Sequence, residues 1–124
     1  MQPLPLLVGY DGSPSARRAL DRAATLTNYG SQLVVATVSA DERGLEKSHG
    51  LLDEAERQLI LQRVFCQKRA LVGKPAEALI SLAMETKADL IVVGNGKTAL
   101  QRLLLGSVST QVVHDAPCDV LVVR

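Results

Sequence analysis

The chain has 124 residues, with 14 lysine and arginine against 13 aspartate and glutamate residues, so its formal net charge is +1. This length suits one domain, and the balanced charge excludes the strong positive field that is typical of nucleic-acid-binding proteins. Hydrophobic residues make up 47% and charged residues 22%, which favours a globular core over disorder. We therefore expect a single domain over residues 1–124 and no nucleic-acid partner.

Aromatic side chains are scarce in this sequence. Tyr10, Tyr29 and Phe65 are the only ones, and tryptophan is absent. This scarcity excludes the aromatic platforms on which the bases of single strands stack. The core must be built from valine, leucine, isoleucine and alanine, which is typical of a buried parallel sheet covered by helices.

The two cysteines, Cys66 and Cys118, lie far apart and form no CxxC pattern. Neither a disulfide framework nor a metal site is therefore expected. The first residues contain neither the basic segment nor the long apolar segment of a secretory signal peptide. No apolar run reaches the roughly 18 residues of a membrane span. We expect reduced thiols in a cytoplasmic protein that has no membrane partner.

The first third of the chain predicts a strand, a helix and a second strand. Residues 4–10 form a short apolar run that ends in a glycine-rich loop. Ser13 as N-cap and Pro14 at the first helical position start a helix, for which Gly30 supplies the stop. Residues 32–38 are the second strand, so the unit is strand–helix–strand and its two strands are predicted to be parallel.

The rest of the chain continues this alternation. Residues 39–50 are polar, and we expect an exposed connection that is the most mobile segment. Helical spacing of apolar residues predicts a helix over 51–62, followed by an irregular edge strand from 64–66 and 70–72. A third helix opens at Pro75, a strand follows at 89–93, and a short helix capped by Ser107 precedes a last strand at 119–123. Five strands alternating with four helices predict an α/β fold, a three-layer open sandwich around a parallel sheet.

A glycine-rich stretch between the fourth strand and the last helix carries the candidate chemistry. Gly94, Gly96 and Gly106 can adopt positive φ and let backbone N–H groups approach a ligand, and the following helix start favours an anion. These features suit a phosphate cradle, although glycines between two elements are also ordinary turn residues. Gly96-Lys97-Thr98 is similar to the end of a P-loop, but that motif needs a glycine where this chain has Ile91.

The whole chain resembles the universal stress protein family. The segments 7–13, 88–94, 104–109 and 114–123 are similar to the family's first strand, its fourth strand and its closing signature. The resemblance implies the strand order 3-2-1-4-5 and a fold of the adenine nucleotide alpha hydrolase type. In the ATP-binding branch the loop reads glycine, two residues, glycine, nine residues, glycine, then serine or threonine. Gly96, Gly106 and Ser107 match that spacing, but only Asn95 follows Gly94, so this loop is one residue short. The chain is also short for the family, mostly within 39–50.

The resemblance also implies a set of nucleotide-binding residues. Asp11 matches the aspartate near the nucleotide, and Val38 matches the position whose backbone reads the adenine edge. Lys97 is a separate candidate from its place in the loop, where it can meet phosphates, although loop lysines are usually solvated. The ribose and phosphate cradle corresponds to Gly94, Gly96, Gly106, Ser107, Val108 and Ser109. Ligands of such sheets bind at the carboxyl ends of the strands where the strand order reverses, which agrees with this set. For Asp11 a second interpretation stays open, because Asp-Gly-Ser-Pro is also a turn and helix-start sequence that needs no ligand.

The resemblance leaves two functions open. The first is an ATP-binding regulator of the stress response, with or without Mg²⁺, and the second is a protein of the same fold that acts through dimerisation and protein partners without nucleotide. No general base, nucleophile or metal-ligand pair accompanies the cradle, so at most weak ATP hydrolysis is expected. An adenylating enzyme of the same superfamily is disfavoured, because residues 9–13 lack its Ser-Gly-Gly-x-Asp-Ser loop. In either case we expect a homodimer through the edge strand 119–123, which has no proline or lysine to block pairing.

Overall fold

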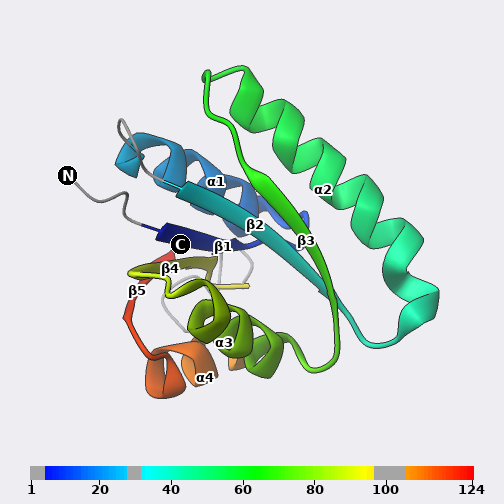
Figure 1. The fold of residues 1–124 in the computed structure, drawn as a ribbon, viewed down its shortest axis with the longest axis vertical. Coiled ribbons are helices and arrows are strands. Elements are labelled where there is room, and N and C mark those ends of the chain that lie inside the picture. The colour runs from blue at the N-terminus through cyan, green and yellow to red at the C-terminus, as the bar shows by residue number, and fades with distance from the viewer. Residues whose placement is uncertain (1–4, 28–31, 97–105) are drawn as a thin grey trace.

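Five parallel strands form one sheet at the centre of the computed structural model, in the order β3-β2-β1-β4-β5 (Figure 1). The structure describes residues 5–27, 32–96 and 106–124. Along the chain, the elements are β1 (Pro5–Gly9), α1 (Pro14–Leu26), β2 (Gln32–Ser39), the 3-10 turn η1 (Glu42–Gly44), α2 (Leu45–Ile60), β3 (Gln67–Val72), α3 (Pro75–Thr86), β4 (Leu90–Gly94), α4 (Ser107–Asp115) and β5 (Asp119–Val123). The predicted fold class, strand order and parallel pairing of the first two strands are confirmed.

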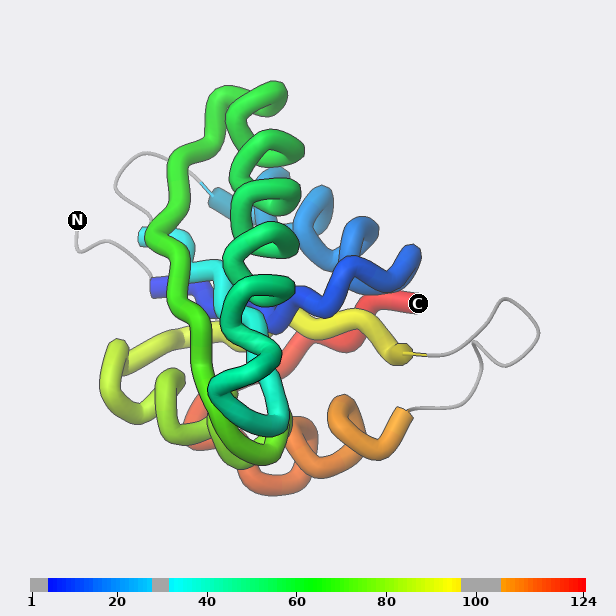
Figure 2. The backbone as a smooth tube through the Cα atoms, turned by 90° about the vertical axis from the view of Figure 1, so that its right-hand side faces the viewer, coloured from blue at the N-terminus to red at the C-terminus, as the bar shows by residue number. Residues whose placement is uncertain are grey.

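Helices cover both faces of this sheet, with α1 and α2 on one side and α3 and α4 on the other (Figures 1 and 2). Alternate residues of a strand point to opposite faces, so neighbours in one strand enter different core layers. In β1, Val8 packs with Leu20 and Leu59 under α1 and α2, whereas Leu7 packs with Leu79 and Val112 under α3 and α4. All six of these side chains are buried. This explains why the strands read as continuous apolar runs in the sequence.

The segment after β2 differs from its prediction. The exposed connection was expected to extend to Gly50, but α2 begins at Leu45 and Gly50 lies inside the helix. The 3-10 turn η1 leads into α2. Asp41 is the N-cap of η1, because its carboxylate accepts a hydrogen bond from the N–H of Arg43 at 2.9 Å. Ser48 is fully packed inside the first turns of α2. The stretch is polar although it is helical, because this helix buries only a narrow stripe of side chains.

Three smaller boundaries also differ. The third strand is β3 alone, so residues 64–66 are not part of a strand, while its place at the sheet edge is confirmed. Helix α1 ends at Leu26, before the stop predicted at Gly30, which lies outside the described residues. Ser107 is the first residue of α4 and Gly106 is its N-cap, so the capping role predicted for Ser107 is wrong. Among the described residues, no helix is long and apolar enough to cross a bilayer.

Both cysteines are free, half-buried thiols. Burial raises the pKa of Cys66 and of Cys118, and nearby carboxylates act in the same direction. Both groups are therefore neutral thiols at neutral pH, and Cys118 packs against the core under α3 and α4.

Candidate functional site

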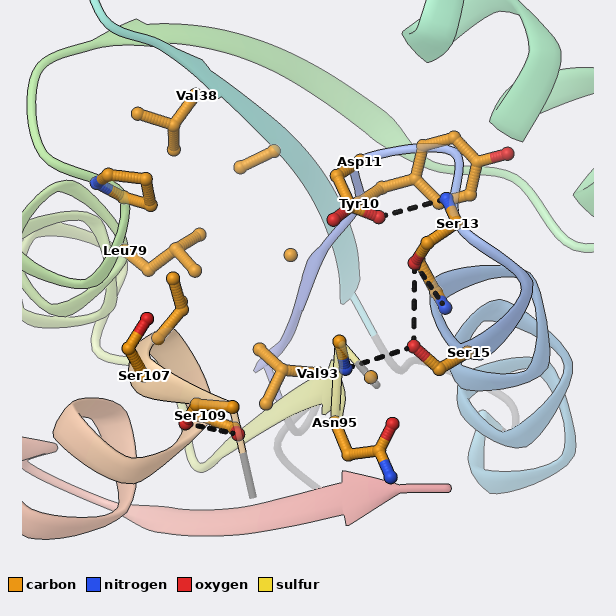
Figure 3. Close-up of a pocket in the computed structure, with 18 residues that line it drawn as sticks. Tyr10, Asp11, Ser13, Ser15, Val38, Leu79, Val93, Asn95, Ser107 and Ser109 are labelled. Carbon is orange, nitrogen blue, oxygen red and sulfur yellow. Dashed lines mark hydrogen bonds between the residues drawn. The ribbon is translucent and has the colours of Figure 1, made fainter. Parts of the chain in front are cut away.

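A pocket of about 330 Å³ opens at the carboxyl ends of β1, β2 and β4, bounded by the starts of α1, α3 and α4 (Figure 3). Strand order reverses here, because β1 pairs with β2 on one side and with β4 on the other. The pocket is lined by Gly9, Tyr10, Asp11, Ser13, Ser15, Ala16, Ala36, Val38, Pro75, Leu79, Val93, Gly94, Asn95, Gly96, Gly106, Ser107, Val108 and Ser109. Parallel sheets of this kind bind ligands at such a crevice.

The structure brings eight of the nine sequence-predicted site residues to this one pocket. They are Asp11, Val38, Gly94, Gly96, Gly106, Ser107, Val108 and Ser109. The ninth, Lys97, lies outside the described residues. Residues from four separate parts of the chain therefore converge on one pocket.

Asp11 holds the turn at the pocket rim. Its carboxylate accepts a hydrogen bond from the N–H of Ser13 at 2.9 Å, and Gly12 between them has a φ of +81°. Ser13 in turn accepts the N–H of Ala16 at 3.2 Å, which confirms its predicted N-cap role. The turn interpretation of Asp11 is thus correct, and the same carboxylate remains exposed at the pocket.

Ser15 is a pocket residue that no pattern in the sequence indicates. Its hydroxyl is buried at the start of α1 and accepts a hydrogen bond from the N–H of Gly96 at 3.2 Å. The hydroxyl groups of Ser13 and Ser15 lie 3.4 Å apart, so these two serines link the loop after β1 to the loop after β4 (Figure 3). Gly94 permits this contact, because a Cβ there would lie 2.6 Å from the Ser15 carbonyl carbon. Nothing in the spacing of a serine at a helix start signals a partner so distant in sequence.

The three loop glycines serve different purposes. Gly96 adopts the positive φ that was predicted, +71°. The φ of Gly106 is negative, at −73°. Gly94 does not adopt a positive φ either. Space explains Gly106 instead, since a Cβ at this position would lie 2.5 Å from the carbonyl oxygen of Asn95. The prediction of positive φ is therefore wrong for Gly94 and Gly106, where close backbone approach requires glycine.

Backbone donors for an anion are concentrated at the start of α4. The N–H of Gly96 is bonded to Ser15, and that of Gly106 donates to the Asn95 carbonyl at 2.9 Å. The first intrahelical bond of α4 comes from Thr110, which donates to the Gly106 carbonyl. The N–H groups of residues 107–109 have no acceptor within the helix and carry the positive end of its dipole. An anionic group would meet these three donors.

Backbone groups of β2 face the apolar half of the pocket. The Ala36 carbonyl accepts the N–H of Tyr10 on the β1 side, and the Ser39 carbonyl accepts the N–H of Gly73 on the β3 side. Backbone groups alternate sides along a strand, so those of Val38 point to the β1 side. Because β1 ends at Gly9, the Val38 N–H and C=O extend past it toward the pocket. They supply one donor and one acceptor beside Leu79 (Figure 3).

The loop after β1 is fixed from two neighbouring elements. The Tyr10 phenol donates a hydrogen bond to Glu54 of α2 at 3.0 Å, and the Thr37 hydroxyl of β2 donates to the Tyr10 carbonyl at 2.9 Å. Arg17 contacts the same Glu54 carboxylate. Burial, together with Glu54, raises the pKa of the Tyr10 phenol, which keeps it a hydrogen-bond donor at neutral pH.

Ser15→Ala is expected to destabilise the fold. The change leaves the Gly96 N–H without its acceptor, which costs about 1 kcal/mol of the free energy of unfolding. Urea denaturation measures this loss, and Ser81→Ala, an exposed serine on α3, is the matched control. Equal stability of the two variants would show that the Ser15–Gly96 bond contributes nothing.

The fold and the pocket define an open, doubly wound α/β protein with a crevice at its switch point. The universal stress protein family model matches residues 4–124. The chain belongs to this family, and the predicted resemblance is confirmed.

Individual relatives cover nearly all of the chain. A universal stress protein of Mycobacterium tuberculosis, Rv1636, is 34% identical over 138 residues, covering 96% of this chain and 94% of its own. One from Thermus aquaticus is 37% identical over 143 residues, with coverages of 96% and 97%. A solved universal stress protein in complex with cAMP has a TM-score of 0.81 and 36% identity, covering 100% of this chain and 98% of its own. The alignments to the Mycobacterium tuberculosis and Thermus aquaticus proteins are longer than the 124 residues of this chain, so these two relatives contain residues that this chain lacks.

Proposed function

We propose that this protein binds an adenine nucleotide in the pocket and acts as a nucleotide-responsive regulator in the stress response. The observation that carries the proposal is the pairing of an apolar slot with a helix N-terminus inside one crevice. The slot is formed by Val38, Leu79 and Val93, and the helix is α4. The cAMP complex of a relative with 36% identity supports the same ligand class.

The proposed pose follows from the donors and acceptors around the pocket. Adenine lies against Leu79 with its 6-amino group donating to the Val38 carbonyl. The ribose passes between Asp11 and Gly94, and the phosphate meets the backbone N–H groups of residues 107–109. The hydroxyl of Ser107 lies at the same helix start (Figure 3). A phosphate at a helix N-terminus is favoured by both free donors and the helix dipole.

Discrimination between AMP and GMP tests this pose. Guanine presents an acceptor oxygen where adenine presents an amino donor, so the Val38 carbonyl would face another acceptor. We expect GMP to bind about tenfold or more weakly than AMP, the cost of one unmade buried hydrogen bond. Isothermal titration of both nucleotides measures the ratio, with adenosine as the control for the phosphate contribution. Equal affinities for AMP and GMP would contradict the role of Val38.

We also propose that the protein is a homodimer paired through β5. This strand is a sheet edge and its apolar residues are only half-buried. The Val123 carbonyl accepts the N–H of Asn95 next to β4, so the backbone groups of Leu121 also face β4. Those of Val120 and Val122 then point outward, unpaired within one chain. Antiparallel pairing of two copies, with Leu121 on the two-fold axis, would match Val120 of each with the partner's Val122.

A further inference from the structure

A second surface lies where the chain passes from α2 to β3. This turn is at the amino end of β3, whereas the pocket is at the carboxyl ends of the strands. This turn protrudes at one end of the molecule in both views (Figures 1 and 2). Leu61 is 86% exposed and Phe65, the only phenylalanine of the chain, is 81% exposed. Together with Ile60 and the exposed Arg57 and Arg63 they form what we call the α2–β3 surface. Large apolar side chains grouped in this way are unusual on a protein that has no partner there.

The segment that carries these apolar residues contains charged side chains of one sign only. Residues 57–75 contain five lysines and arginines and no aspartate or glutamate, although the whole chain is nearly neutral. Lys68 and Arg69 are compensated by carboxylates of α2 and α3. Within the described part of the chain, Arg57 and Arg63 have no ion pair. The α2–β3 surface therefore presents uncompensated positive charge beside its apolar side chains.

The backbone places Arg63 at a position that normally favours glycine. Its N–H donates to the Ile60 carbonyl at 2.8 Å, and the N–H of Val64 donates to the Leu59 carbonyl at 3.0 Å. These bonds form the helix-ending motif whose turn residue is left-handed, and Arg63 accordingly has a φ of +60°. A non-glycine residue is disfavoured in this conformation. A long cation at the tip of the turn thus opposes local stability, which points to a use for its charge.

We propose that the α2–β3 surface docks a protein segment that has an apolar side chain flanked by carboxylates. Phe65 and Leu61 would cover the apolar side chain, and Arg57 and Arg63 would pair with the flanking acids. A second copy of this chain is a poor occupant, because its identical surface would bring like charges together. An anionic membrane fits less well, since stable anchoring needs a broader apolar face or more cations than two arginines.

Selection from a library of random short peptides tests the proposal on the full chain. We expect the selected peptides to share leucine, phenylalanine or tryptophan flanked by aspartate or glutamate. Fluorescence anisotropy of one labelled selected peptide then gives its affinity for each variant. Phe65→Ser should weaken binding roughly 30-fold, as for an aromatic residue at the centre of an interface. Met84→Ser, which removes a 64% exposed side chain on α3, is the matched control and should leave the affinity unchanged.

Arg63→Gly separates binding from folding. Glycine suits the left-handed turn, so this variant should be at least as stable as the natural chain to urea while binding the peptide several-fold more weakly. Selection without an acidic and apolar consensus, or an affinity unaffected by Phe65→Ser and Arg63→Gly, would overturn the proposal. Binding to phosphatidylserine vesicles that is lost in both variants would assign the surface to membranes instead. Self-association lost in Phe65→Ser would assign it to a second copy. cAMP affinity should be equal in all these variants, so the outcome does not depend on the nucleotide pocket.

Discussion

Gly106→Val abolishes nucleotide binding if the pocket holds the ligand as proposed. A Cβ at this position would lie 2.5 Å from the carbonyl oxygen of Asn95, and a backbone atom cannot move aside as a side chain can. The start of α4 must shift away from β4, which moves the N–H groups of residues 107–109 from the phosphate. We expect at least about a hundredfold loss of affinity, since two or more charge-assisted hydrogen bonds are lost.

Two measurements distinguish loss of the site from loss of the fold. Circular dichroism reports whether the variant retains its helices, and Gly106→Ala makes the same contact with Asn95 but adds less bulk than valine. Gly50→Ala is the matched control, because a Cβ on this α2 residue meets nothing within 4 Å. It should bind normally and gain about 0.5–1 kcal/mol in the free energy of unfolding. A folded Gly106→Val variant with unchanged affinity would refute the assignment of the phosphate to α4.

Val122→Pro is expected to convert the proposed homodimer into a folded monomer. The N–H of Val122 points away from β4, so proline removes a donor to the second copy without removing a bond inside the sheet. Sedimentation equilibrium should give a mass near the 13.3 kDa of one chain, against twice that mass for the natural protein.

Leu121→Pro is the informative comparison for this experiment. Its N–H faces β4, so proline there breaks the sheet and should lower the free energy of unfolding by about 3 kcal/mol. A natural protein that sediments as one chain, or a Val122→Pro variant that remains dimeric, would show that β5 is not the interface.

The sheet could be predicted from the sequence because its strands are short apolar runs bounded by glycine or polar residues. Leu7 and Val8 point to opposite faces of the sheet and both are buried, so each face of the strand must be covered. Such strands occur in sheets with helices on either side. The site residues could be located because the strand order places the loops after β1 and β4 together, and the resemblance supplied that order. The fold class and eight pocket positions followed from these two facts.

What the sequence could not predict depends on tertiary contacts. The first turns of α2 are polar, and their helical state follows from packing of Ser48 and Leu51 against the rest of the fold. Ser15 gains its importance from Gly96, 81 residues away. The reason for Gly106 is a carbonyl oxygen that approaches from the end of β4, which no local pattern contains. For Gly94 and Gly106, local spacing identified where glycine is needed but gave the wrong reason, whereas positive φ is correct for Gly96.

Equilibrium dialysis of the natural protein with labelled ATP, with and without magnesium, and with labelled cAMP tests the central claim most directly. We predict saturable retention of an adenine nucleotide at one site per chain, displaced by unlabelled AMP and absent in Gly106→Val. Retention of neither nucleotide above the protein-free background, by protein that is folded in the same buffer, would contradict the proposed function.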